Sequence, residues 1–182
     1  MHIILQPRRR FLRQVLAGAM AGSIVARGSA TDPNHAPNPM RTIVSEGFGR
    51  VVILGFNRGE KLLEGIRERL KGLGIKNAVL VSAIGTFEKA RFHRITTTQP
   101  KPQDEIIEIE GPMELAAVDG IVADGEPHFH VVFQDMNRTY AAHLEDGCVV
   151  CYLAEVVLAE IRGVELVRVA NQYGIRLLQK KN

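Results

Sequence analysis

The sequence predicts an α+β domain in which a mainly antiparallel β-sheet accompanies one principal helix. Runs rich in Val, Ile and Leu recur from residue 48 to residue 170, at lengths typical of strands. A single stretch, residues 60–73, carries apolar side chains at helical spacing. Turn signals at residues 124–127 and 135–138 favour hairpins between neighbouring strands. Many strands around one helix indicate the α+β class.

The first strand and the helix follow directly on one another. Residues 48–56 (FGRVVILGF) form a β-rich run, and Asn57 follows as a cap residue with Glu60 three positions on. Gly72 and Gly74 are expected to end the helix, because glycine permits a left-handed terminus. The helix places its apolar side chains on one face, at Leu62, Leu63, Ile66, Leu70 and Leu73.

The rest of the domain is predicted to be mostly strands. Residues 148–161 are apolar enough for either a strand or a helix, and the end of the chain, residues 179–182, is expected to fray. The turn at 124–127 leads into a strand that carries two histidines. Further strands are expected at residues 77–84, 90–96, 105–109, 113–122 and 164–170.

Residues 1–30 have the pattern of a bacterial export signal, with a basic start, a mild apolar run and a small-residue exit. The apolar run is too short to span a bilayer, which takes about 20 residues. We expect cleavage after Ala30, which would leave no stable membrane anchor on a periplasmic or secreted protein. The alternatives are an uncleaved anchor or a leader created by a wrongly chosen start codon. The basic start resembles a twin-arginine motif at Arg8, Arg9, Phe11 and Leu12.

Four segments follow from this reading. Residues 1–30 are the signal peptide, and residues 31–41 are a flexible Pro-rich linker. Residues 42–175 suit one folded domain, and residues 176–182 are a C-terminal tail.

The charge balance argues against duplex DNA as a partner. The chain has 23 Lys and Arg against 20 Asp and Glu. Five arginines and no acidic residue lie in residues 1–30, so the mature chain has 18 basic and 20 acidic side chains, a net charge of −2. DNA binding draws much of its free energy from basic groups that displace counterions. A local basic patch remains possible at Lys89, Arg91, His93 and Arg94.

Three histidines are the strongest chemical signal. His128 and His130 share a face of a strand because side chains alternate. Symmetric pairing about the turn at residues 136–137 places His130 opposite His143, and His128 opposite Glu145. Three imidazoles and a carboxylate on one patch suit zinc or another divalent transition metal. The opposite face would be apolar and face the core, with Phe129, Val131, Phe133, Tyr140, Ala142 and Leu144.

Two other interpretations of these histidines remain open. The first is an ordinary polar patch on the sheet. The second is a lining for an organic anion, which protonated imidazoles provide below about pH 6.5. A loop of odd length would also break the pairing of His130 with His143.

Cys148 and Cys151 form a C-x-x-C pair. On a strand their Cα atoms lie about 10 Å apart on opposite faces, which excludes a disulfide. On a helix the pair could be redox-active. We expect buried, inert thiols because apolar residues surround them, with a ligand role for Cys148 as the alternative.

From about residue 48 to residue 169 the chain resembles the plants-and-prokaryotes-conserved (PPC) domain, also catalogued as a domain of unknown function. The order and spacing of the matching motifs make the resemblance specific. They are 57–60 (NRGE), 81–85 (VSAIG), 110–115 (EGPMEL), 125–131 (GEPHFHV), 143–144 (HL) and 145–150 (EDGCVV).

The resemblance implies a curved antiparallel sheet with a helix, assembled as a homotrimer. It also implies a metal, typically zinc, on His128, His130 and His143. The family is often labelled DNA-binding, but its plant members contact DNA through a separate Arg-Gly-Arg segment that this sequence lacks. We therefore discount DNA as a partner.

Two classes of function stay open beside DNA binding, and whether the protein is an enzyme is left undecided. In the first, a metal-binding module holds a small ligand that the sequence does not identify. In the second, a hydrolase or lyase uses zinc-bound water, whose pKa can fall to about 7. Glu145 or Glu126 could then be a general base or a partner that orients an imidazole. No serine nucleophile elbow or phosphate loop is present.

Overall fold

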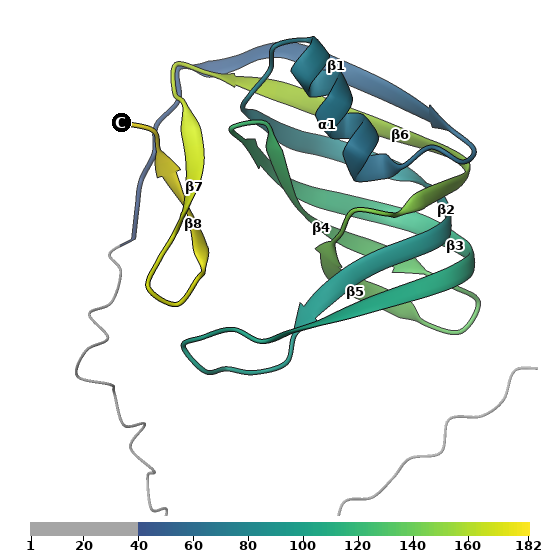
Figure 1. Ribbon diagram of the computed structural model, residues 1–182. Helices are drawn as coiled ribbons and strands as arrows, with labels where there is room; N and C mark the ends of the chain where they lie inside the picture. The colour runs from purple at the N-terminus through teal and green to yellow at the C-terminus, as the bar shows by residue number, and fades with distance from the viewer. Residues whose placement is uncertain (1–39) are drawn as a thin grey trace, which may run out of the picture. The chain divides into compact units, whose positions relative to one another are not determined.

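Eight strands and one helix make up residues 40–182, the part of the chain that the computed structural model describes (Figure 1). The predicted leader, its cleavage site and most of the predicted linker lie outside the described residues. Among residues 40–182, no helix is long and apolar enough to cross a membrane. The elements are β1 (Gly47–Asn57), α1 (Leu62–Gly72), β2 (Ala78–Ile95), β3 (Asp104–Ala123), β4 (Glu126–Gln134), β5 (Thr139–Leu144), β6 (Val149–Arg162), β7 (Leu166–Ala170) and β8 (Arg176–Lys180).

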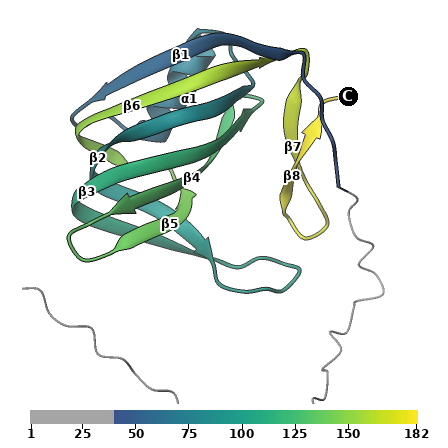
Figure 2. The same cartoon turned by 180° about the vertical axis from the view of Figure 1, so that it is seen from behind.

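Six strands form one antiparallel sheet in the order β1-β6-β2-β3-β4-β5, and β7 and β8 form a separate hairpin (Figures 1 and 2). The sheet curves strongly, because β5 also pairs with the far end of β2. Strands β2, β3, β4 and β5 therefore close into a ring. The predicted α+β class with a mainly antiparallel sheet and one helix is confirmed.

Strands β2 and β3 are each longer than predicted. The predicted strands at 77–84 and 90–96 are one strand, and so are those at 105–109 and 113–122. Register shifts absorb the irregular residues between them, so the pairing continues past each glycine instead of ending there. Residues 148–161, open to either reading in the sequence, form strand β6.

The helix begins at Leu62, later than the predicted cap Asn57, which is the last residue of β1. The Glu60 carboxylate does accept a hydrogen bond from the Asn57 backbone N–H, at 2.6 Å. However, backbone hydrogen bonds tie Gly59 and Leu62 to the start of β6, which keeps this segment extended. Gly74, at φ +68°, ends the helix in the left-handed conformation as predicted.

The core lies between the helix and the concave face of the sheet. Leu62, Leu63, Ile66 and Leu70 of α1 are buried, whereas Leu73 caps the helix and is exposed. The predicted apolar face of β4 and β5 is in this core: Phe129, Val131, Phe133 and Leu144 are buried, and Tyr140 and Ala142 pack against them.

The C-terminal residues form a hairpin. Residues 176–180, assigned by the sequence to a tail, instead pair with β7 as strand β8. The Asn171 side-chain oxygen accepts backbone hydrogen bonds from Tyr173 and Ile175, which shapes the turn. Leu178 packs on a small cluster of Ala123, Val164 and Leu166, so the tail gains an apolar partner that the sequence pattern does not reveal.

Strand β3 lies very close to β4 where Gly120 pairs with Phe129. Gly120 has φ +148°, and a Cβ atom there would collide with the carbonyl oxygen of His128. A residue without a side chain is therefore required for β4 to lie at its observed distance from β3.

We expect Gly120→Ala to destabilise the fold by more than Gly111→Ala. Both glycines have positive φ, +148° and +133°, but only Gly120 has backbone within reach of a new Cβ. Backbone strain at either position costs about 1–3 kcal/mol, and the clash adds to it at Gly120 alone. Urea unfolding of both variants measures the difference. Equal losses of stability would contradict the close approach of β3 and β4.

Candidate functional site

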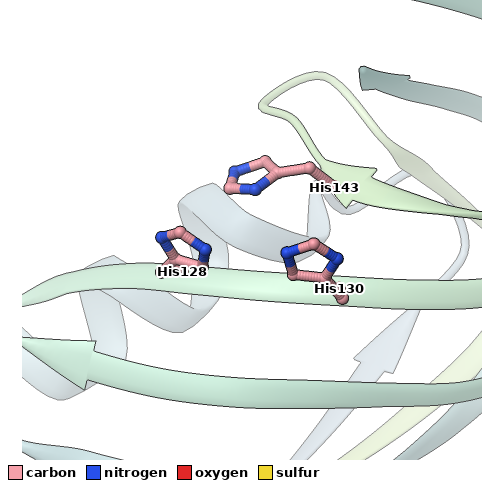
Figure 3. A group of neighbouring side chains, drawn as sticks. All are labelled: His128, His130 and His143. Atoms are coloured by element: carbon pink, nitrogen blue, oxygen red, sulfur yellow. The ribbon is translucent and has the colours of Figure 1, made fainter. Parts of the chain in front are cut away.

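The hairpin of β4 and β5 brings His128, His130 and His143 onto one surface (Figure 3). The predicted pairing of His130 with His143 is confirmed. The turn between the strands is held by Asp135, whose Oδ1 accepts backbone hydrogen bonds from Asn137 and Arg138. This turn sets the register, and the register places the two imidazoles directly opposite each other.

The three imidazole rings form a compact triangle. Their centroids lie 5.6 Å apart for His128 and His130, 4.7 Å for His128 and His143, and 5.3 Å for His130 and His143. Each ring offers one nitrogen within 4.8 Å of the nitrogens offered by the other two. Zinc–nitrogen bonds are about 2.0–2.1 Å long, so small rotations would bring all three nitrogens onto one ion.

The ring nitrogens of these three residues have no hydrogen-bond partner among residues 40–182, and two of the rings, His128 and His143, favour the neutral form. Burial lowers the pKa of His143 to about 4, with a contribution from the charges of the neighbouring histidines. Burial also lowers the pKa of His128, helped by Arg168. A metal ion needs the neutral imidazole, so these two residues meet it in the correct form at neutral pH.

His93 is a fourth histidine at this site, which the sequence placed only in a local basic patch. It lies on β2 directly opposite His143. The two rings stack with centroids 4.3 Å apart. Histidines 130, 143 and 93 therefore form a row across β4, β5 and β2. The long sequence separation of β2 from β5 hides this neighbour from any local pattern.

The predicted pairing of His128 with Glu145 is wrong. Strand β5 ends at Leu144, and the backbone N–H of Glu145 donates to the Arg91 carbonyl of β2. The Glu145 carboxylate lies 2.6 Å from Nδ1 of His93 instead. The carboxylate is thus turned to the β2 side of the site, away from His128.

His93, His143 and Glu145 form a second group that could hold a metal ion, and it shares His143 with the first. In this group His93 and Glu145 already bond each other. The three-histidine group therefore fits a metal better, because its nitrogens have no competing partner in the described chain.

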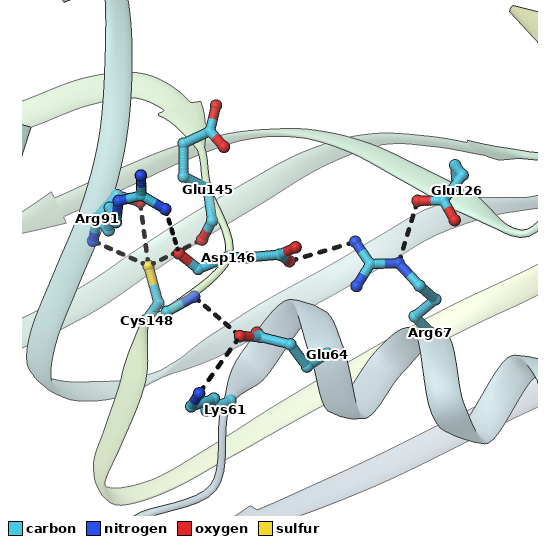
Figure 4. A network of polar contacts seen from close by, with 9 residues as sticks. Lys61, Glu64, Arg67, Arg91, Glu126, Glu145, Asp146 and Cys148 are labelled. Atoms are coloured by element: carbon cyan, nitrogen blue, oxygen red, sulfur yellow. Dashed lines mark hydrogen bonds and ion pairs between the residues drawn. The ribbon is translucent and has the colours of Figure 1, made fainter. Parts of the chain in front are cut away.

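Glu126, the other acidic candidate, is bound by the helix (Figure 4). Arg67 of α1 contacts the Glu126 carboxylate at 3.1 Å and the Asp146 carboxylate at 3.2 Å. Glu126 starts the strand of His128, and Asp146 follows the strand of His143. One guanidinium thus links the ends of both histidine-bearing strands to the helix.

Both cysteines are free and buried, as predicted. Cys148 is enclosed by backbone of Arg91 and Glu145 (Figure 4), and burial raises the pKa of its thiol to about 11. A thiol that stays protonated is a poor metal ligand and a poor nucleophile.

The histidines open onto a cavity of about 980 Å³. Its walls come from the ends of β2 and β4, the segment between β2 and β3, and the hairpin of β7 and β8. A cavity of this volume admits a small organic molecule. The side chains that give it its chemistry are His93, His128, His130, His143, Arg168 and Arg176.

Comparison with known families finds a match over residues 44–162 to the model of the Plants and Prokaryotes Conserved (PCC) domain. A curated relative, the bifunctional protein GlmU of Synechococcus, is 26% identical over 125 residues. That match covers 68% of this chain but only 18% of the relative.

Solved structures share the fold. A metal-containing protein from Archaeoglobus fulgidus is 26% identical, with a TM-score of 0.66, covering 77% of this chain and 99% of that one. A plant- and prokaryote-conserved protein from Pyrococcus horikoshii is 28% identical, with a TM-score of 0.66, covering 79% and 99%. A protein provisionally named as DNA-binding, from Bacteroides thetaiotaomicron, is 14% identical, with a TM-score of 0.61 over 74% and 96%.

Proposed function

Because this chain belongs to the Plants and Prokaryotes Conserved domain family, we propose that it is a metal-binding module that presents a divalent ion to a small ligand. The ligands of the metal are His128, His130 and His143. The observation that carries this proposal is the triangle of imidazoles with no other bonding partner in residues 40–182. The metal-containing relative from Archaeoglobus fulgidus supports it.

Zinc is the first choice of metal, because imidazole nitrogens suit it and three protein ligands leave a position for a further ligand. That position would face the cavity. When bound, the ion would act as a Lewis acid toward an oxygen or nitrogen atom of the ligand. Three protein ligands suit a site that binds a further molecule, whereas a purely structural zinc site has four protein ligands.

A hydrolase or lyase is the second candidate, favoured by the pair of Glu145 and His93. The carboxylate lies 2.6 Å from His93 Nδ1, and the His93 ring stacks on His143. Such a pair can accept and return a proton beside the metal. Glu126 is a weaker candidate for this purpose, because its carboxylate is already engaged by Arg67 at 3.1 Å.

DNA binding has less support. The likeness to the protein named as DNA-binding is 14% identity, which speaks for the fold alone. The charge of residues 31–182 is −2 by side-chain count. A net negative charge gives no electrostatic support to the sequence-independent part of DNA affinity.

We propose that the chain assembles with itself, as a homotrimer. The outer face of β1, β2 and β6 supports self-association, because it exposes neighbouring apolar side chains. Contiguous exposed apolar surface is typical of protein interfaces. The exposed residues are Val51, Ile53, Val81, Ile84 and Leu153, named here the outer apolar face.

We also propose export. The arginine pair and apolar run of residues 1–30 support a twin-arginine leader that is removed after Ala30. The metal site would then operate in the periplasm or outside the cell.

We expect the purified protein to contain one transition metal ion per chain, and the triple variant H128A/H130A/H143A to contain none. The variant lacks every nitrogen of the proposed site. Elemental analysis by mass spectrometry measures the metal. His93→Ala is the matched control and should keep its metal, because His93 belongs only to the second group. Full metal content in the triple variant would contradict the proposal, and loss in H93A alone would move the site to His93, His143 and Glu145.

We expect light scattering after gel filtration to give a mass of three chains, and Ile53→Glu to give a monomer. A carboxylate at this 75% exposed position would have to be buried in an interface on the outer apolar face. Met136→Glu, at the exposed tip of the β4–β5 turn, should stay trimeric. A monomeric wild-type protein would rule out the trimer.

We expect cell fractionation to recover the protein outside the cytoplasm and without its leader. The R8K/R9K variant should stay in the cytoplasm at full length, because twin-arginine transport reads that pair. Arg13→Lys, outside the pair, should be exported normally. Recovery of full-length wild-type protein in the cytoplasm would remove the proposal.

A further inference from the structure

Two arginines line the same cavity as the histidines, but they belong to the C-terminal hairpin and not to the main sheet. Arg168 lies on β7 and Arg176 begins β8, in the hairpin that follows the matched family region 44–162. Neither guanidinium has an ion-pair partner within the described chain. A partly buried cation such as Arg168 is normally paired with an anion, whereas Arg176 is exposed to solvent.

The other charged side chains of the cavity wall are mostly neutralised by neighbours. Arg94 pairs with Glu105 at 2.8 Å, and Glu126 pairs with Arg67 at 3.1 Å. Asp124 faces Lys181 at 3.7 Å. Of the acidic groups, Asp104 alone has no ion pair in residues 40–182, and its charge acts on His143. The charge left over at the hairpin is therefore positive.

Arg168 is held in place by backbone carbonyls and not by a carboxylate. Its Nη1 donates to the carbonyl of Glu126 at 3.4 Å, and its Nη2 donates to the carbonyl of Ile121 at 3.2 Å. Burial lowers the pKa of Arg168, and the positive charge of Arg176 lowers it further. The remaining N–H donors of both guanidiniums are available to an anion.

We propose that the cavity binds a small organic molecule through an oxyanion group, a carboxylate or a phosphate, held by Arg168 and Arg176. Guanidinium groups match the planar geometry of carboxylate and the oxygens of phosphate through paired N–H donors. The opposite end of the molecule points toward the three histidines, and this half of the assignment rests on the proposed metal function. His128, Arg168 and Arg176 line the same cavity, so one small molecule in it can reach both groups.

Titration calorimetry at constant ionic strength tests the assignment, with succinate and inorganic phosphate as probes and succinamide as the neutral match for succinate. We expect the full-length protein to bind at least one anion and to ignore succinamide. The R168Q/R176Q variant should bind the anion at least about tenfold more weakly. Arg94→Gln, in the same wall but already paired with Glu105, should change affinity less than about twofold.

Arg176→Gln guards against a folding artefact. Arg176 makes no side-chain hydrogen bond or ion pair within the described residues, so its loss leaves the hairpin intact while removing one charge. It should still weaken anion binding. The probe that binds more tightly, succinate or inorganic phosphate, identifies the oxyanion as carboxylate or phosphate.

The outcomes separate this assignment from the metal proposal. If neither anion binds the wild type, or if R168Q/R176Q binds as the wild type does, the oxyanion site is overturned whatever the metal content. If the protein carries no metal but the anion still depends on both arginines, the oxyanion site stands and the metal proposal fails. Unchanged metal content in R168Q/R176Q, measured on the same samples, shows that the arginines act on the anion and not on the ion.

Discussion

The backbone pairing of β5 with two partners at once is the constraint on which this site depends. β5 pairs with β4 through His130 and His143, and with β2 through His93 and His143. The two pairings can coexist only because the long strands β2 and β3 curve and close the ring. A flat sheet would leave β5 as an open edge and would separate His93 from the other imidazoles. The same pairing turns Phe92 and Leu144 into the core, so burial of apolar surface on one face holds the polar cluster on the other.

Much of this arrangement could be predicted from short stretches of sequence, because it depends on local rules. Alternation along β4 separates His128 and His130 from Phe129 and Val131, and a compact turn pairs His130 with His143. The features that could not be predicted all depend on contacts between distant segments. His93 reaches the site because β2 pairs with β5. Glu145 turns to His93 because β5 ends at Leu144, one residue before Glu145. The tail becomes a strand because Leu178 finds an apolar cluster formed by β3 and the segment before β7.

The helix contributes to the site although none of its residues lies among the histidines. Arg67 bonds Glu126 and Asp146, which lie at the start of β4 and just beyond β5. The buried face of α1 anchors the helix to the core, which fixes the position from which Arg67 extends. Each ion pair is partly exposed and individually weak. Their value here is geometric, because they hold the two strands that carry the imidazoles at a set distance from a rigid element.

The two chemical halves of the cavity come from different parts of the chain. The imidazoles project from the main sheet. Backbone pairing with neighbouring strands and the alternation of side chains along β4 fix their positions. The guanidiniums belong to the C-terminal hairpin, whose turn is shaped by Asn171 and whose Leu178 packs on a cluster that includes Ala123 of β3. Under the oxyanion proposal, substitutions at Arg168 and Arg176 would change which anion is bound, while the backbone pairing that positions the imidazoles stays the same. Residues of the hairpin could thus change ligand specificity during evolution, while the strands that carry the histidines keep the same chemistry.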